Sequence, residues 1–282
     1  MNRGSIRPMT SNTRPPCALT IAGSDSGGGA GIQADLKTFA AHRVHGLSAI
    51  AALTAQNTRG VSAVHVPDVG FLRAQIDACF EDFDVTAVKL GMLANADVIE
   101  AVADALATHH PRHIVLDPVM VATSGARLLE QSALHALRHR LLPLASVITP
   151  NLPEAEILLG RPIADRDAMP AAVQALRELG VRAVLLKGGH LPDSADVLDL
   201  FADGEGLRAI SHPRLALQAH GTGCTLAAAI AAQLCLGATM ADACAAAADY
   251  VHAGLQRAYR PGLADVFVLD HFGAADGLRR DG

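Results

Sequence analysis

Short apolar runs alternate with longer segments of helical periodicity from residue 17 to about residue 190. The apolar runs, which have the length of buried strands, are residues 18–22, 47–53, 87–90, 113–116, 147–149 and 183–186. The segments between them predict helices over residues 32–42, 72–83, 97–108, 132–141 and 171–179. Strands that are apolar throughout and separated by helices are typical of a parallel sheet covered on both faces. The pattern therefore predicts an α/β fold with an open, mostly parallel sheet and helices on both faces.

The pattern changes after residue 190. Two short strand-like runs, 197–201 and 207–210, flank the turn Asp203-Gly204, and two alanine-rich helices follow them. No linker rich in Pro, Gly or Ser interrupts the chain after residue 16, whereas the glycines and prolines of residues 1–16 would break any helix there. We therefore expect a disordered N-terminal tail over residues 1–16 and a single domain over residues 17–282.

Composition narrows the classes of partner. Of the 282 residues, 50% are hydrophobic and 18% are charged, which allows a sizeable core and excludes a disordered chain. Aromatic residues make up 3% and the net charge is −5, so no nucleic-acid partner is expected. The longest apolar stretch, residues 225–241, is interrupted by Gln233 and Gly237, so it predicts a core helix and no membrane association. Five cysteines without a CxxC pair are typical of reduced thiols, and we expect a cytoplasmic protein.

A first glycine cluster, residues 23–31, follows a predicted strand and precedes a predicted helix. Such turns expose backbone N–H groups and let a ligand approach the main chain. The cluster matches the loose GxGxxA dinucleotide fingerprint, but that fingerprint needs an acid at the end of the second strand, where this chain has Gln56 and Asn57. A dehydrogenase is therefore disfavoured, and no GxxxxGK[ST] phosphate loop occurs in the sequence.

A second glycine cluster, His220-Gly-Thr-Gly-Cys-Thr225, opens a predicted helix. Two glycines let the N–H groups turn toward one point, and the helix dipole adds partial positive charge there. Such a site stabilises an oxyanion or a phosphoryl group in transfer. A thiol at a helix start tends to have a lowered pKa, so Cys224 is a candidate general base. The alternative is a buried structural cysteine.

Polar residues stand at the carboxyl ends of the predicted strands, where open parallel sheets bind ligands. They are Gln56, Lys89, Asp117, Asn151 with Glu154, and Lys187. Asp117 and Glu154 could hold Mg²⁺ directly or through water, and Lys187 could meet phosphate groups. Asn151 and Glu154 could instead serve only as the cap of a helix.

Together these motifs resemble those of a known family, the hydroxymethylpyrimidine/phosphomethylpyrimidine kinases of thiamine biosynthesis, which have a ribokinase-like fold. The resemblance covers residues 17 to about 255. It rests on ALTIAGSD at residues 18–25, GGAGIQADLKTF at 28–39, KLGM at 89–92, VLDPVM at 115–120, TPNLPEA at 149–155, KGGH at 187–190 and HGTGCT at 220–225. It implies a kinase that uses ATP to phosphorylate the 5-hydroxymethyl pyrimidine and then its monophosphate. A homodimer is also implied.

The resemblance assigns roles to individual residues. Asp35 and Gln56 are expected to hydrogen-bond the aminopyrimidine, in a pocket that is lined by Gly23, Ala30, Met92 and Val119. Mg²⁺ and ATP are expected to be held by Asp117, Glu154, Asn151, Lys187 and Thr222. The anion hole is expected from Gly221, Thr222 and Gly223, with Cys224 as the catalytic residue.

Two other functions remain open at this point. Some pyridoxal kinases look similar, but they carry a second cysteine after the Asp-Pro-Val-Met-Val run, where this chain has Ala122. A non-catalytic pyrimidine-binding sensor on the same scaffold is disfavoured because the acids, the lysine and the cysteine are all present. Residues 121–128 are rich in small residues and predict a lid that excludes water during transfer, with an ordinary surface loop as the alternative.

Overall fold

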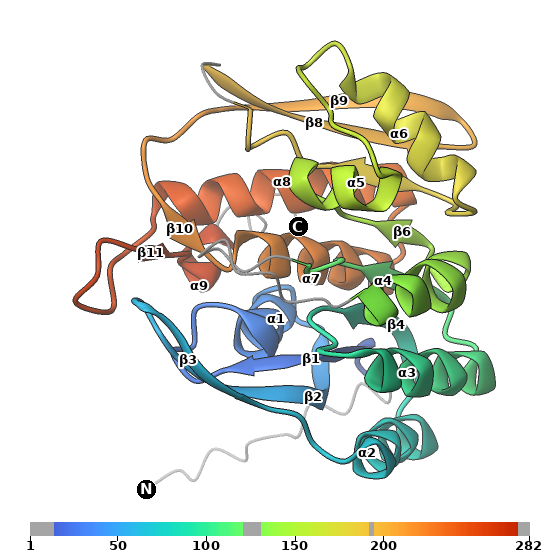
Figure 1. Ribbon diagram of the computed structural model, residues 1–282. Helices are drawn as coiled ribbons and strands as arrows, with labels where there is room; N and C mark the ends of the chain where they lie inside the picture. Colours follow the sequence, from blue (N-terminus) through green and yellow to red (C-terminus); the bar gives the residue numbers. More distant parts are fainter. Residues whose placement is uncertain (1–13, 121–130, 192–194, 276–282) are drawn as a thin grey trace, which may run out of the picture.

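The computed structural model describes residues 14–120, 131–191 and 195–275. Within them, a nine-stranded sheet has the order β3-β2-β1-β4-β5-β6-β7-β8-β9 (Figure 1). Its six central strands are parallel; β3 pairs antiparallel with β2, β8 with β7, and β9 with β8. The strands are β1 (Cys17–Asp25), β2 (His45–Asn57), β3 (Gly60–His65), β4 (Val85–Leu90), β5 (His113–Leu116), β6 (Val147–Ile148), β7 (Val184–Leu186), β8 (Asp196–Asp203) and β9 (Gly206–Pro213). A separate pair joins β10 (Ala219–His220) to β11 (Phe267–Val268).

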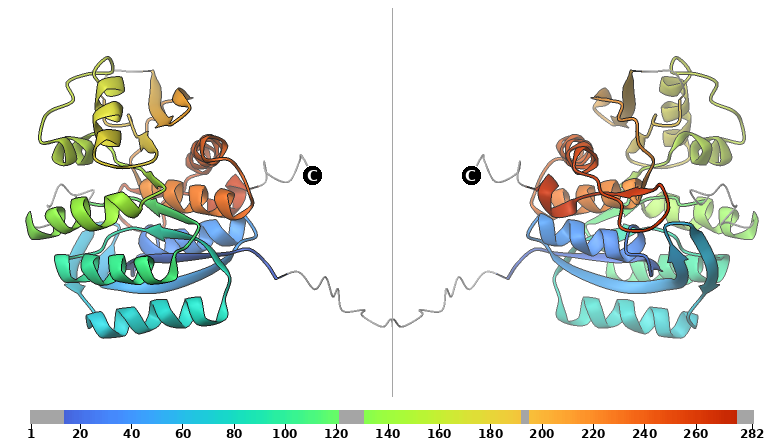
Figure 2. Two further views of the ribbon diagram at one scale, coloured as in Figure 1. Left: turned by 90° about the vertical axis from the view of Figure 1, so that its right-hand side faces the viewer. Right: turned by 90° about the vertical axis from the view of Figure 1, so that its left-hand side faces the viewer.

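Helices cover both faces of the sheet, because successive side chains of each buried strand point to opposite sides. In β5, Ile114 and Leu116 pack into one core cluster, and Val115 packs into the other. Figure 2 shows α3 and α4 on one side of the strands and α1 and α7 on the other. The helices are α1 (Gly31–Ala41), α2 (Val69–Asp82), α3 (Ala96–His109), α4 (Gln131–Ala136), α5 (Leu152–Leu159), α6 (Met169–Glu178), α7 (Thr222–Cys235), α8 (Met240–Gln256) and α9 (His271–Ala274), with short π and 3-10 segments at Leu137–Leu141 and Leu142–Leu144.

The predicted mostly parallel α/β sheet is confirmed, and every strand and helix predicted from the apolar pattern is present, most of them with shifted ends. The strand β3 was not predicted. All six of its residues are exposed, so it has no apolar alternation, and its backbone pairing with β2 holds it at the sheet edge. In the described part of the chain, no helix has the length and apolarity needed to cross a membrane.

Three sequence predictions are not tested by these elements. Residues 1–13 of the predicted tail and the predicted lid over residues 121–128 lie outside the described residues. The single domain over residues 17–282 stays a prediction.

Candidate active site

A cavity of about 970 Å³ opens at the carboxyl ends of the parallel strands. This is the edge at which an open α/β sheet binds its ligands. All but one of the predicted site residues line it: Gly23, Ala30, Gln56, Met92, Asp117, Val119, Asn151, Glu154, Lys187, Gly221, Thr222, Gly223 and Cys224. The structure therefore brings these residues together, and their individual roles stay predictions.

Asp35 is the exception. Its side chain is fully buried on α1, where one carboxylate oxygen accepts hydrogen bonds from the Thr20 hydroxyl at 2.6 Å and the Lys89 ammonium at 2.8 Å. Burial raises the pKa of Asp35, and Lys89 acts in the opposite direction. Neither Asp35 nor Lys89 lines the cavity, and together they form a buried ion pair. The expected contact between Asp35 and the pyrimidine stays a prediction.

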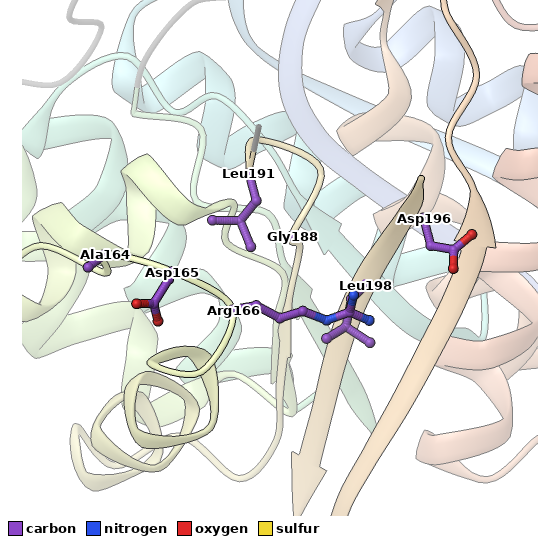
Figure 3. A pocket seen from close by; sticks show the side chains of 7 residues that line it. All are labelled: Ala164, Asp165, Arg166, Gly188, Leu191, Asp196 and Leu198. Atoms are coloured by element: carbon purple, nitrogen blue, oxygen red, sulfur yellow. The ribbon is translucent and has the colours of Figure 1, made fainter. Parts of the chain in front are cut away.

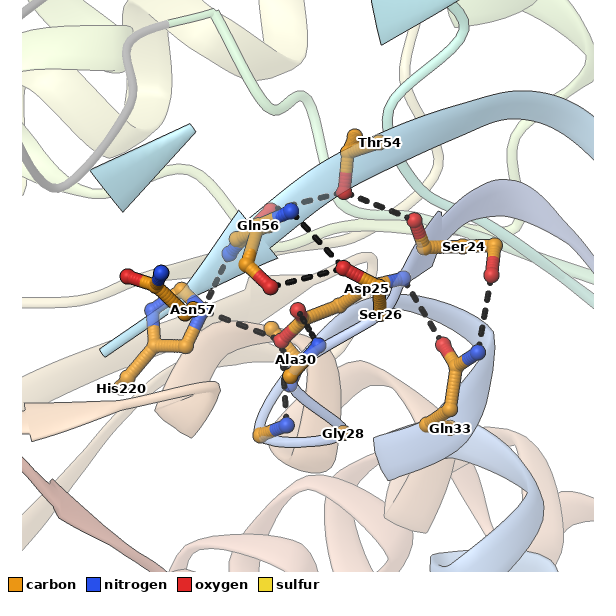
Figure 4. A network of polar contacts seen from close by, with 12 residues as sticks. Ser24, Asp25, Ser26, Gly28, Ala30, Gln33, Thr54, Gln56, Asn57 and His220 are labelled. Carbon is orange, nitrogen blue, oxygen red and sulfur yellow. Dashed lines mark hydrogen bonds and ion pairs between the residues drawn. The ribbon is translucent and has the colours of Figure 1, made fainter. Parts of the chain in front are cut away.

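The first glycine cluster is organised by Asp25, the last residue of β1 (Figure 4). Its carboxylate accepts hydrogen bonds from the N–H groups of Gly27 at 2.7 Å, Gly29 at 3.0 Å and Ala30 at 2.8 Å. Burial by itself raises the pKa of Asp25, but hydrogen bonds from His220 and from these N–H groups outweigh it and lower the pKa. Sequence reasoning gave Asp25 no role. The pattern that could have indicated its role is an aspartate inside a glycine-rich turn, because such a side chain can accept hydrogen bonds from the backbone N–H groups of the turn.

The second glycine cluster forms the start of α7. Gly221 is the N-cap and has a φ of +82°, a left-handed conformation that favours glycine. A Cβ at this position would clash with the carbonyl oxygen of Gly29, so the two glycine clusters are in direct contact. The first N–H groups of a helix have no acceptor within it. Those of Thr222, Gly223 and Cys224 are therefore available to an anion in the cavity.

Opposite charges surround this helix start. Asp117 is buried after β5, and its carboxylate accepts hydrogen bonds from the Thr149 hydroxyl at 3.1 Å and the Lys187 ammonium at 3.0 Å. Gly223 packs against the same ion pair, because a Cβ there would lie 3.2 Å from Lys187 Nζ and 3.3 Å from Asp117 Oδ2. The backbone of α7 thus approaches the acid and the lysine as closely as glycine allows.

Glu154 combines a structural and an electrostatic role. It forms a capping box with Asn151, in which the Asn151 side chain accepts the Glu154 N–H at 2.9 Å and the Glu154 carboxylate accepts the Asn151 N–H at 2.8 Å. The cap expected as an alternative is therefore present, and Glu154 also lines the cavity. Burial raises the pKa of Glu154 to about 7; Asp117 contributes in the same direction and Lys187 opposes it.

Two buried carboxylates facing one cavity are suited to a hard cation. Among the residues that the structure describes, no group of three or more His, Cys, Asp or Glu side chains is placed to hold a metal ion. Mg²⁺ commonly uses only one or two carboxylates and completes its shell with water and phosphate oxygens. Asp117 and Glu154 fit that donor set, because a divalent cation near them would offset the repulsion that helps to raise the Glu154 pKa.

We expect Glu154→Gln to stabilise the protein in the absence of divalent cations, and to do so more at pH 8 than at pH 5. The folded state disfavours the ionised carboxyl, so this penalty is absent below the ordinary pKa of 4.5 and grows as the pH rises toward about 7. Denaturant unfolding of both proteins at the two pH values measures the difference. Exposed Glu178→Gln, on α6, is the control and should change little. An equal effect of Glu154→Gln at both pH values would contradict the prediction.

The thiol of Cys224 differs from the sequence expectation. Burial raises its pKa to about 11, Asp35 and Asp117 add to the increase, and Lys89 and an N–H of Gly31 act against it. The expected fall of the pKa at a helix start is therefore wrong for this structure, because burial and two nearby carboxylates outweigh the helix terminus. The thiol is protonated at neutral pH.

A smaller cavity of about 190 Å³ lies beside β8 (Figure 3). Its lining includes Gly188, which follows the site lysine, together with Arg166 and Leu198. None of the predicted site residues lines it. The larger cavity therefore holds the candidate chemistry.

The parallel sheet, the anion-binding start of α7 and the lysine with two acids define a phosphotransferase site for a small molecule. A model of the phosphomethylpyrimidine kinase family matches residues 25–268. A hydroxymethylpyrimidine/phosphomethylpyrimidine kinase of Rhizobium meliloti (strain 1021) is 52% identical over 245 residues, which are 86% of this chain and 91% of the relative. The chain belongs to the phosphomethylpyrimidine kinase family.

Solved structures of two kinases share the fold of this chain. The crystal structure of phosphomethylpyrimidine kinase from Clostridium difficile 630 has a TM-score of 0.76 and 40% identity, covering 85% of this chain and 98% of that one. The ADP complex of Bacillus subtilis pyridoxal kinase has a TM-score of 0.85 and 35% identity, covering 92% and 98%. The predictions of a ribokinase-like fold and of an ATP-dependent kinase of thiamine biosynthesis are confirmed.

Proposed function

We propose that this chain transfers the terminal phosphoryl group of ATP to 4-amino-5-hydroxymethyl-2-methylpyrimidine and then to its monophosphate. The observation that carries the proposal is the continuity of the cavity, which joins the carboxamide of Gln56 to the N–H groups at the start of α7. The first can pair with an aminopyrimidine edge, and the second can hold a phosphoryl group.

The residues divide between two ends of the cavity. Gln56, Met92 and Val119 enclose the pyrimidine, and Gly23 and Ala30 line the cavity with them. Met92 packs over Gly23, because its Cε lies 2.6 Å from where a Gly23 Cβ would stand. At the other end, Lys187 neutralises phosphate charge, and the N–H groups of residues 222–224 stabilise the charge that develops in transfer. Asn151 and Thr222 contact the nucleotide.

Asp117 and Glu154 hold Mg²⁺, which supplies neutralisation of phosphate charge when bound. Cys224 lies at the N-terminus of α7 and lines the cavity. We propose that Cys224 accepts the proton of the attacking hydroxyl. It can do so only as a thiolate, after it has lost its own proton.

An assay of ADP release with three alcohols tests the activity. We expect turnover with the hydroxymethyl pyrimidine and with its monophosphate, and at most weak turnover with pyridoxal. Pyridoxal as the best of the three would establish the alternative kinase function instead.

Gln56→Ala should raise the KM for the pyrimidine and leave the KM for ATP nearly unchanged. Losing the partner of a ligand polar group costs about 1–3 kcal/mol. Initial-rate kinetics with each substrate varied in turn separates the two constants. Asn57→Ala is the matched control, because Asn57 also lines the cavity but its carboxamide oxygen accepts the N–H of Arg59 at 2.8 Å. An equal loss of ATP affinity would show that Gln56 is not a pyrimidine contact.

A single domain, a homodimer and a cytoplasmic location complete the proposal. All five cysteines are free, which supports a reducing compartment. Leu53, Val61 and Val64 on the β2–β3 edge are exposed, and the two valines also line the cavity. This apolar edge supports burial against a second copy. Sedimentation velocity of the purified protein measures the oligomeric state, and a monomer would exclude the dimer.

A further inference from the structure

The carboxamide of Gln56 is held from two sides (Figure 4). On one side, the amide Nε2 is placed 2.8 Å from Nε2 of His220, and the same His220 Nε2 lies 3.4 Å from the Asp25 carboxylate. On the other side, the amide Oε1 is placed 3.1 Å from the hydroxyl oxygen of Thr54. The residue that should meet the pyrimidine is thus part of a polar network.

The Thr54 hydroxyl decides which amide atom faces which neighbour. Its oxygen lies 2.9 Å from the carbonyl oxygen of Ser24 and 3.1 Å from the amide of Gln56. A hydroxyl has one proton, and the Ser24 carbonyl can only accept it. We assign the proton to the shorter contact, the one to Ser24, so that toward Gln56 the hydroxyl accepts. This assignment turns the amide by 180° from the placement in which Oε1 faces Thr54, and brings its NH₂ to Thr54. Amide oxygens and nitrogens are assigned from such networks, since they are nearly equal in size.

The other half of the network agrees with this orientation. With the NH₂ toward Thr54, the amide oxygen faces His220 and needs a donor there. His220 supplies it when Nε2 carries the proton. The Asp25 carboxylate favours that same tautomer, because an ionised acceptor beside Nε2 stabilises an N–H at that position. One arrangement thus satisfies Ser24, Thr54, Gln56, His220 and Asp25 together.

Asp25 is well placed to fix the imidazole. Its carboxylate is buried and held by the N–H groups of Gly27, Gly29 and Ala30, so it cannot move without disturbing the glycine turn. His220 also packs on that turn, since a Cβ at Gly29 would lie 3.2 Å from the imidazole Cδ2. The imidazole therefore has a defined position as well as a defined tautomer.

We propose that Asp25, His220 and Thr54 are positioning residues that lock the carboxamide of Gln56 in one orientation, and that this lock selects a pyrimidine with an amino group beside a ring acceptor nitrogen. A carboxamide that can rotate by 180° pairs equally well with an amino pyrimidine, which offers a donor and an acceptor, and with an oxo pyrimidine, which offers them in the reverse order. A locked carboxamide pairs with one of them and leaves the other with two mismatched groups. The proposal rests on the proposed function, since it concerns the same pocket.

The test compares 4-amino-5-hydroxymethyl-2-methylpyrimidine with its 4-oxo analogue as phosphoryl acceptors. The wild-type enzyme should prefer the amino compound in kcat/KM. His220→Ala and Thr54→Val, each of which removes one side of the lock, should lower the ratio of amino to oxo turnover about tenfold or more, since one hydrogen bond corresponds to about a factor of ten. Thr54→Ser keeps the hydroxyl and should retain the ratio.

A second readout does not depend on turnover. In protein labelled with ¹⁵N-histidine, the ring nitrogens of His220, assigned by their disappearance in His220→Ala, should report the Nε2–H form. Asp25→Asn should shift that signal toward a mixture of tautomers.

The outcomes are distinct. Unchanged ratios in both His220→Ala and Thr54→Val would overturn the lock, as would an Nδ1–H form of His220 in the wild type. Equal wild-type turnover of the amino and oxo compounds would overturn the selection alone. A wild-type enzyme that phosphorylates neither compound would overturn the proposed function itself.

Discussion

Gly223→Ala is expected to lower kcat/KM about hundredfold or more without destabilising the protein. The new Cβ would lie 3.2 Å from Lys187 Nζ and 3.3 Å from Asp117 Oδ2, so it would separate these two groups and fill the space in front of the helix N–H groups. Alanine keeps its own N–H group, but its Cβ takes space that an anion needs in front of that group, and loss of one such preorganised contact typically costs 10²- to 10³-fold in rate.

The same substitution should increase the stability of the folded protein. Gly223 lies within α7, and alanine is favoured over glycine in a helix by up to about 1 kcal/mol. Thermal unfolding together with steady-state kinetics therefore separates a damaged site from a damaged fold. Gly70→Ala is the matched control, because Gly70 is likewise the second residue of its helix, α2, and a Cβ there would meet only the Asp68 side chain, at 3.0 Å. Near wild-type kinetics of Gly223→Ala would show that the phosphoryl group does not pass this point.

The fold was predictable because the chain encodes it locally. Each central strand is apolar on both faces, so its pattern differs from that of the helices around it, and the element order alone indicates a parallel sheet. The strand β3 shows the limit of that signal. It is exposed throughout and owes its structure to backbone hydrogen bonds with β2, which leave no periodicity in the side chains.

The site was predictable where strand ends determine it. Asp117 and Lys187 follow buried strands directly, and the carboxyl ends of parallel strands lie at one edge of the sheet. Asp35 differs from these residues because it lies on a helix. The motif that contains it gives no indication that its side chain points inward to Lys89 instead of into the cavity.

The network around Gln56 could not be predicted from spacing. His220 and Gln56 are 164 residues apart in the chain and meet only because the start of α7 packs on the first glycine turn. The same packing places Cys224 near Asp35 and Asp117, whose charges help to raise the thiol pKa. A rule about helix termini could not include carboxylates that come from other elements.

At pH 10, where roughly a tenth of a thiol with a pKa of about 11 is ionised, Cys224→Ala is expected to lower kcat by about 10²- to 10⁴-fold, because a positioned general base contributes about that factor. Both substrates should still bind, because the anion hole consists of main-chain N–H groups. The raised pKa adds a second signature. Below a pKa of about 11 the thiolate fraction increases about tenfold with each pH unit, so wild-type kcat should rise with pH between 7 and 10. Cys224→Ser, whose hydroxyl stays protonated throughout, should be slow and independent of pH in that range.

Alkylation provides an independent check of the same thiol. Iodoacetamide should modify Cys224 slowly at pH 7 and faster at pH 9, because the thiolate is the reactive form, and bound pyrimidine should protect it. Peptide mapping distinguishes Cys224 from the other four cysteines. Cys224→Asp should keep part of the activity, because a carboxylate at this position can also accept the hydroxyl proton. If Cys224→Ser instead retains wild-type kcat and the wild-type rate does not change with pH, the thiol only shapes the cavity, and transfer depends on Lys187, the metal-binding acids and the N–H groups of α7.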